Sequence, residues 1–206
     1  MNLAHPRLFW LIAPLCLALW LILATPTHWL GFETPAIGTA LLLLTTWVGL
    51  GWSTRLPTDP QSAIPPGEVR AWVALVFTAA IAALLAFSAG RILQAESMAD
   101  LHGVGRTFAM LIIGWIIFSS VLRQRARAGV QEDERDRDIE RRADSWAHGA
   151  VCLLVVGLAV TLGLTPSDRL EWARPVVLSH LLIFLLVLSS LTGCLVTLWL
   201  YRRDRL

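Results

Sequence analysis

The chain has 206 residues, of which 56% are hydrophobic and 16% are charged, and its formal net charge is +2. Soluble domains usually carry about 25% charged residues, and here the few charges are clustered, so that long uncharged runs separate them. Such runs, at about 18 residues or more, exceed what a soluble core uses. The composition excludes an ordinary soluble domain, and the small net charge gives no reason to expect direct nucleic-acid binding.

Six apolar segments predict an all-α, polytopic membrane protein that forms a single integral membrane domain over residues 1–206. The first segment follows Arg7, and we interpret it as a transmembrane helix with a tolerated bend at Pro14. A signal peptide is the alternative, but its apolar region usually spans about 7–15 residues. The fourth segment covers only about 24 Å as a helix, so we expect flanking residues to extend it. The predicted spans are 8–24, 34–52, 71–90, 107–122, 145–167 and 175–201.

The segments between the spans predict loops. Residues 55–70 contain four prolines and a glycine, so they cannot be helical throughout. Residues 91–106 are mixed and polar, and we predict a loop there as well. Small residues that share one face of each of the last two spans predict close packing of these two helices in lipid. They are Gly157 and Thr161 in the fifth span, and Ser189, Gly193 and Thr197 in the sixth.

The distribution of arginines predicts the topology. Six spans put both termini on one side of the membrane, and 13 of the 17 arginines fall on that side, against four on the other. The positive-inside rule then places both termini and residues 123–144 in the cytoplasm. The chain has no lysine beside its 17 arginines, which is typical of GC-rich bacterial genomes. We therefore predict a multi-pass protein of a bacterial inner membrane.

The longest polar segment of the chain is residues 123–148, which hold seven of the 17 arginines and seven of the 15 acidic residues. We predict a helical cytoplasmic connector over 123–144 that is broken or bent at Gly129. Acid–arginine pairs at i,i+3 and i,i+4, such as Asp138–Arg142, stabilise such a helix by about 0.2–0.5 kcal/mol each. The first arginines of the connector are candidates for contacts with anionic lipid headgroups, worth about 1 kcal/mol each. They are Arg123, Arg125 and Arg127.

Two interpretations of the connector remain open. It is either a solvated link that runs straight into the fifth span, or a docking surface for a cytoplasmic protein or a hinge between spans four and five. Near-zero net charge with alternating signs suits specific pairing better than adhesion to lipid. Ile139, Ala143 and Trp146 form a narrow apolar stripe that we expect to dock on the helix bundle. The candidate interaction or regulatory residues are Asp133, Glu134, Arg135, Asp136, Ile139, Arg142, Asp144 and His148.

A D-E-R-D-x-x-I…A-D-x-x-A-H pattern and a Y-R-R tail mark the second half of the chain. The residues that form them are Asp133, Glu134, Arg135, Asp136, Ile139, Ala143, Asp144, Ala147, His148, Tyr201, Arg202 and Arg203. In these residues the chain resembles a family of small, uncharacterised polytopic inner-membrane proteins of bacteria. The resemblance implies an inner-membrane protein, and some members of that family look like membrane partners of small helix-turn-helix regulators.

Ionisable residues inside a span are functional candidates by default. His148 is such a residue, and Asp144 lies four positions before it on the same helical face. The alternative is an interfacial histidine bonded to Asp144 or to Arg202 and Arg203. His180 lies near the opposite interface, about 20 Å away in a hydrocarbon layer of about 30 Å, so we expect no shared metal ion. The three cysteines lie in apolar runs, where we expect small packing residues; they are Cys16, Cys152 and Cys194.

Catalytic motifs are not found in the sequence. Ser97, Asp100 and His102 are close together, but they lack the nucleophile elbow of a hydrolase. We therefore predict no enzymatic activity, no cofactor and no metal. The predicted function is a membrane-embedded interaction or regulatory module whose charged cytoplasmic helix contacts a partner protein. The alternative is a small transporter or channel subunit that works as a homodimer in the lipid bilayer.

Overall fold

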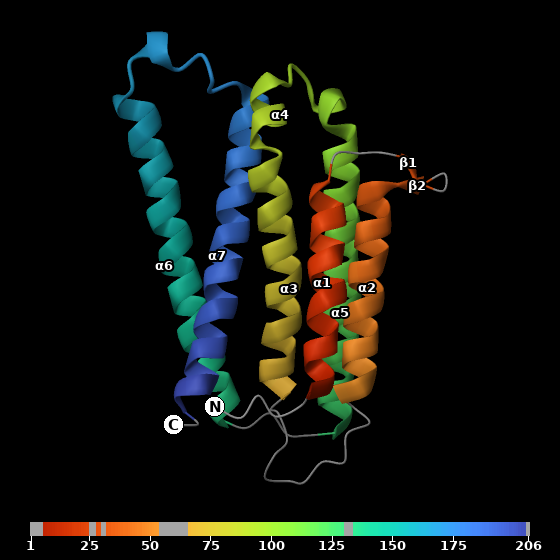
Figure 1. Ribbon diagram of the computed structural model, residues 1–206. Helices are drawn as coiled ribbons and strands as arrows, with labels where there is room; N and C mark the ends of the chain where they lie inside the picture. Colours follow the sequence, from red (N-terminus) through yellow and green to blue (C-terminus); the bar gives the residue numbers. More distant parts are fainter. Residues whose placement is uncertain (1–5, 25–27, 30–31, 54–65, 130–133, 205–206) are drawn as a thin grey trace. The chain divides into compact units, whose positions relative to one another are not determined.

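The computed structural model describes residues 6–24, 28–29, 32–53, 66–129 and 134–204. Helices dominate these residues, as Figure 1 shows, and the predicted all-α class is confirmed. The long helices are α1 (Pro6–Leu23), α2 (Thr34–Ser53), α3 (Pro66–Phe87), α5 (His102–Gly129), α6 (Glu134–Leu164) and α7 (Pro175–Arg203). The shorter elements are α4 (Ala89–Gln94), the 3-10 turns η1 (Met98–Leu101) and η2 (Ser167–Arg169), and the paired strands β1 (His28–Trp29) and β2 (Phe32–Glu33).

Five helices of the described residues are long and apolar enough to cross a membrane, as expected of a multi-pass membrane protein. The first predicted span, 8–24, coincides with α1, whose part from Ala13 to Leu23 is a shorter apolar helix. A total of six spans therefore stays a prediction. The five long segments are Thr34–Gly51, Gly67–Phe87, His102–Leu122, Glu134–Leu164 and Pro175–Arg203.

The third apolar helix differs from the predicted span 71–90, because α3 begins at Pro66 and ends at Phe87. Proline is favoured in the first turn of a helix, where its missing N–H has no partner to lose. Part of the predicted loop 55–70 is thus the first turn of α3, whereas residues 54–65 lie outside the described residues.

The prediction of a loop over 91–106 is wrong, because α4, η1 and the start of α5 cover most of this segment. Asp100 organises the turn between the helices. Its carboxylate accepts hydrogen bonds from the backbone N–H of Ser97 (2.8 Å) and Glu96 (3.0 Å) and from the Ser97 hydroxyl (3.2 Å). These bonds from Ser97 and Glu96 hold the pKa of Asp100 below its ordinary value, because they favour the charged carboxylate.

The predicted connector 123–144 is not a separate element but two helical extensions. α5 continues from the fourth apolar segment as far as Gly129, where the sequence predicts a break. α6 begins at Glu134 and runs without interruption into the fifth apolar segment. Residues 130–133, which include the candidate Asp133, lie outside the described residues, as do the side chains of Arg123, Arg125 and Arg127.

The described residues form two compact units, which we treat separately. The first unit contains α1, α2 and the first part of α5, residues 103–114. α1 and α2 pack along each other, and Gly38 of α2 lies where their backbones come closest. A Cβ atom at Gly38 would lie 2.7 Å from the backbone nitrogen of Ile22 and 2.8 Å from the carbonyl oxygen of Ala18. Only glycine fits this contact, in which backbone rather than a flexible side chain is the neighbour.

The second unit contains α3, α4, the second part of α5, α6 and α7. α7 packs against both α3 and α6 (Figure 1). Near the start of α7, Val177 lies in an apolar cluster with Ile92 and Leu101, and the Arg174 guanidinium donates a hydrogen bond to the carbonyl oxygen of Leu93. α7 is thus in contact with the turn that follows α3 near its start and with α6 over its second half.

The close packing predicted for the last two spans is confirmed on α7 but not on α6. The Ser189 hydroxyl donates a 2.7 Å hydrogen bond to the carbonyl oxygen of Ala147, and a Cβ at Gly193 would lie 3.2 Å from the Cβ of Ala147. Gly157 and Thr161 are exposed instead. The small face of α7 meets an alanine of α6 that the sequence analysis did not select, because both helices carry small residues on more than one face.

Replacement of Gly38 by alanine should destabilise the first unit by about 1–3 kcal/mol, the usual cost of overpacking. Gly51→Ala in the same helix is the matched control, because no atom lies within 4 Å of the position of its Cβ. The measurement is thermal unfolding of the purified protein in detergent. A Gly38→Ala protein that unfolds at the same temperature as Gly51→Ala would contradict the close backbone contact.

Candidate functional site: a charged cluster that joins α3, α6 and α7

The first turns of α6 carry most of the D-E-R-D-x-x-I…A-D-x-x-A-H pattern, and an apolar contact holds them against α7. Ile139, which is only 4% exposed, packs in a cluster with Leu200 and Tyr201 at the end of α7. Ala143 is also buried, so the predicted apolar stripe is confirmed at these two positions. It is wrong at Trp146, which is 65% exposed. The contact face continues by four residues to Ala147, and Trp146 lies about 100° around the helix from Ala147 and about 60° from Ala143.

Tyr201 is the centre of the polar contacts at this end of the second unit. Its side chain is buried, and its hydroxyl donates a 2.9 Å hydrogen bond to Oδ1 of Asp136. Gly67, in the first turn of α3, lies directly against this hydroxyl, and a Cβ atom at Gly67 would overlap it. The absence of a side chain at Gly67 is therefore what allows the Tyr201 hydroxyl to reach α6.

Two ion pairs surround this hydrogen bond. Arg70 of α3 pairs with Glu140 of α6, one turn after Asp136. Arg135 of α6 pairs with Asp204, the residue that follows α7, and both Nε and a terminal guanidinium nitrogen lie 3.2 Å from the same Asp204 oxygen. The start of α6 is thus bonded to both α3 and α7.

The magnitudes of these contacts differ. Exposed ion pairs contribute about 0–1 kcal/mol each, and all four side chains of the two pairs are at least 29% exposed. A buried donor or acceptor left without its partner costs more, about 1–3 kcal/mol. The Tyr201–Asp136 hydrogen bond, together with the burial of Ile139, therefore contributes more to the stability of the cluster than the two ion pairs do.

The opposite face of α6 remains exposed. Asp138 and Arg142 form an ion pair of 2.7 Å, which confirms the predicted i,i+4 pairing. Exposed charges continue along this face and around it at Glu134, Arg137, Asp138, Arg141, Arg142 and Asp144. The candidate residues therefore divide into two groups. Arg135, Asp136 and Ile139 are engaged within the chain, whereas Glu134, Arg142, Asp144 and His148 face outward.

His148 makes a contact that the sequence analysis did not consider. Its Nε2 lies 3.7 Å from the Cys152 Sγ, rather than bonding to Asp144 or to Arg202 and Arg203 at the end of α7. The i,i+4 spacing of His148 and Cys152 was available in the sequence and was overlooked. His180 is partly buried in α7, and its Nε2 has no hydrogen-bond partner among the described residues.

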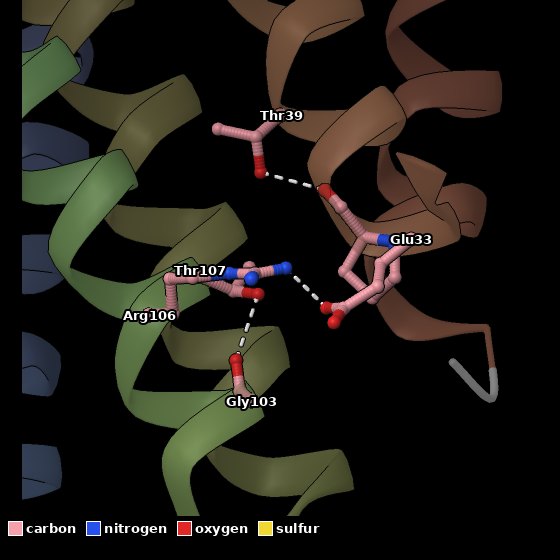
Figure 2. A network of polar contacts seen from close by, with 6 residues as sticks. Glu33, Thr39, Gly103, Arg106 and Thr107 are labelled. Atoms are coloured by element: carbon pink, nitrogen blue, oxygen red, sulfur yellow. Dashed lines mark hydrogen bonds and ion pairs between the residues drawn. The ribbon is translucent and has the colours of Figure 1, made fainter. Parts of the chain in front are cut away.

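A second polar network lies in the first unit (Figure 2). Arg106, in the second turn of α5, forms an ion pair with Glu33 of β2, just before α2. On either side, the Thr39 hydroxyl donates to the carbonyl oxygen of Pro35 (2.8 Å) and the Thr107 hydroxyl to that of Gly103 (3.1 Å). These two bonds satisfy buried hydroxyls within their own helices, whereas the Arg106–Glu33 pair bonds the start of α5 to the residue just before α2.

Comparisons with protein-family models, with curated proteins and with solved structures find no match for this chain. The resemblance in the second half of the sequence therefore stays a prediction. Among the described residues, no group of three or more histidine, cysteine, aspartate or glutamate side chains could hold a metal ion.

The Tyr201→Phe substitution should lower the free energy of unfolding by about 1–2 kcal/mol, because Asp136 keeps its partly buried position but loses its donor. Asp204→Asn, which weakens the exposed pair with Arg135, should cost less than 1 kcal/mol, or about the value of a surface pair. Denaturant unfolding in detergent micelles measures both. Equal losses for the two variants would contradict the ranking of the contacts given above.

Proposed function

We propose that this protein is a membrane-embedded interaction module that presents the first turns of α6 to a cytoplasmic protein partner. The observation that carries the proposal is the division of α6 into two faces. Its inner face is bonded to α3 and α7 through Ile139, Asp136 and Glu140, while its outer face keeps an ordered set of exposed charges. A helix fixed in this way offers its outer charges in one orientation, which lowers the entropy lost on binding.

The proposed setting is a bacterial inner membrane, with both termini and the start of α6 in the cytoplasm. The 13-to-4 distribution of arginines supports this orientation. The contacts support it as well, because Arg70, Glu140 and Tyr201 come from three segments that the sequence places on one side of the membrane. Arg123, Arg125 and Arg127 would then lie beside the anionic inner leaflet, where headgroup contacts are favourable.

The outer face suits a partner with charges of both signs. Asp138 and Arg142 neutralise each other, and Arg141 and Asp144 lie beside them with opposite charges. Such a pattern has little long-range attraction for a uniformly charged surface, but it rewards a partner helix or loop with complementary spacing. A protein surface is therefore favoured over the lipid surface as the ligand of this face.

A transporter subunit is the second candidate, and His180 is the observation that favours it. An ionisable side chain in a membrane helix is costly unless it has a partner or a function, and Nε2 of His180 has no partner among the described residues. If His180 serves transport, proton or solute flux into liposomes that carry the protein should be lost in His180→Ala.

The interaction proposal is tested by crosslinking in intact cells. A photoreactive amino acid at position 141 should yield an adduct with one cytosolic protein, identified by mass spectrometry. The double variant Asp138→Arg/Arg142→Asp keeps an internal ion pair but reverses the outer charges, so it should lose the adduct while membrane insertion is unchanged. Position 164, which is exposed at the other end of α6, is the control and should give no such adduct.

The proposal fails if position 141 gives no protein adduct, or if the charge-reversed variant gives the same adduct as the parent. Either result would leave the first turns of α6 as a solvated link between two helices.

A further inference from the structure

His148 and Cys152 lie on the outward side of α6, next to the proposed interaction face. Both side chains are exposed, whereas Ile139, Ala143 and Ala147 of α6 pack against α7. Residues four positions apart in an α-helix share one face, a spacing that metal-binding helices use for pairs of ligands. Imidazole and thiolate together suit zinc.

We propose that His148 and Cys152 form half of a tetrahedral zinc site, which the same two residues of a second copy of the chain complete. In a tetrahedral site with bonds of about 2.1 Å to nitrogen and 2.3 Å to sulfur, these two ligand atoms are about 3.6 Å apart. Nε2 of His148 and Sγ of Cys152 are 3.7 Å apart. The separation of these two atoms therefore matches the spacing that a tetrahedral zinc ion requires between a nitrogen and a sulfur ligand.

A second copy is needed because the described residues of one chain supply too few ligands. No group of three or more possible ligands is found among them, and structural zinc sites use four. Two copies inserted in the same direction are related by a twofold axis along the membrane normal. This symmetry makes their α6 helices parallel and sets each residue opposite its own counterpart. His148 and Cys152 of one copy then meet the same pair of the other.

The surface around the pair allows a close approach. Ser145 and Gly149 are small and exposed, and no atom lies within 4 Å of the position of a Cβ at Gly149. Small residues let the backbones of two membrane helices come together. On zinc binding, each thiol releases its proton to solvent. Two thiolates and two neutral imidazoles leave the site with no net charge, which is the favourable state near a bilayer.

The cobalt spectrum of the purified protein tests this site. Chelator-treated protein in detergent, titrated with Co²⁺, should show the visible bands of tetrahedral cobalt and a thiolate-to-cobalt charge-transfer band. The expected end point is one ion for two chains, with displacement of Co²⁺ by Zn²⁺. Light scattering should show that Zn²⁺ converts the monomer to a dimer.

Matched variants make the result specific. Cys152→Ala and His148→Ala should each lose the bands and the zinc-dependent dimer. Cys16→Ala should keep both, because Cys16 is exposed but has no histidine four residues away. Bands that persist in Cys152→Ala, the absence of a charge-transfer band in the parent, or binding of one ion by each monomer would overturn the proposal. The crosslinking result at position 141 does not bear on this site, so the two proposals can fail independently.

Discussion

The hydrogen bond from Tyr201 to Asp136 determines how the charged part of this protein is arranged. It can form only because Gly67 leaves room for the hydroxyl at the first turn of α3, and it lies beside the buried side chain of Ile139. One contact therefore involves the start of α3, the start of α6 and the end of α7. The charged start of α6 would otherwise be stabilised only by weak ion pairs along its own helix, and it is instead bonded to α3 and α7.

This arrangement divides the charged segment into residues that bond within the chain and residues that are exposed. Counted along the sequence, its acids and arginines are a uniform polar run. In the structure, Arg135, Asp136 and Glu140 are used within the chain, and Asp138, Arg141 and Asp144 face outward. The inner face is thus engaged within the chain, and the choice between a solvated link and a docking surface concerns the outer face alone.

Much of the fold could be predicted from the sequence, because the length and polarity of a membrane helix are local properties. The apolar segments followed from their uncharged runs, the end of α5 from Gly129, and the burial of Ile139 from the periodicity of its apolar stripe. Contacts between distant segments could not be predicted in this way. Nothing near Arg70 indicates that Glu140 is its partner, since the pairing depends on how α3 and α6 pack.

The errors have physical causes. The turn before α5 looked like a loop because its residues are polar, and the hydrogen bonds that Asp100 accepts from Ser97 and Glu96 are not visible in the sequence. Trp146 was predicted to face inward because a residue three positions after Ala143 can share its apolar stripe as well as a residue four positions after it. The structure shows that α7 contacts Ala147, the residue four positions on. The i,i+4 spacing of His148 and Cys152 was visible in the sequence, but the 3.7 Å distance between Nε2 and Sγ was not.

The central claim is that α6 has an inner face bonded to its own chain and an outer face in the cytoplasm. Cysteine accessibility measures it most directly, with single cysteines placed along residues 138–144 of an otherwise cysteine-free protein and a membrane-impermeant maleimide applied to each side of the membrane. The account predicts labelling at 138, 141 and 144 from the cytoplasmic side only, with protection at 139 and 143. Equal labelling of all five positions, or labelling from the outer side, would contradict it.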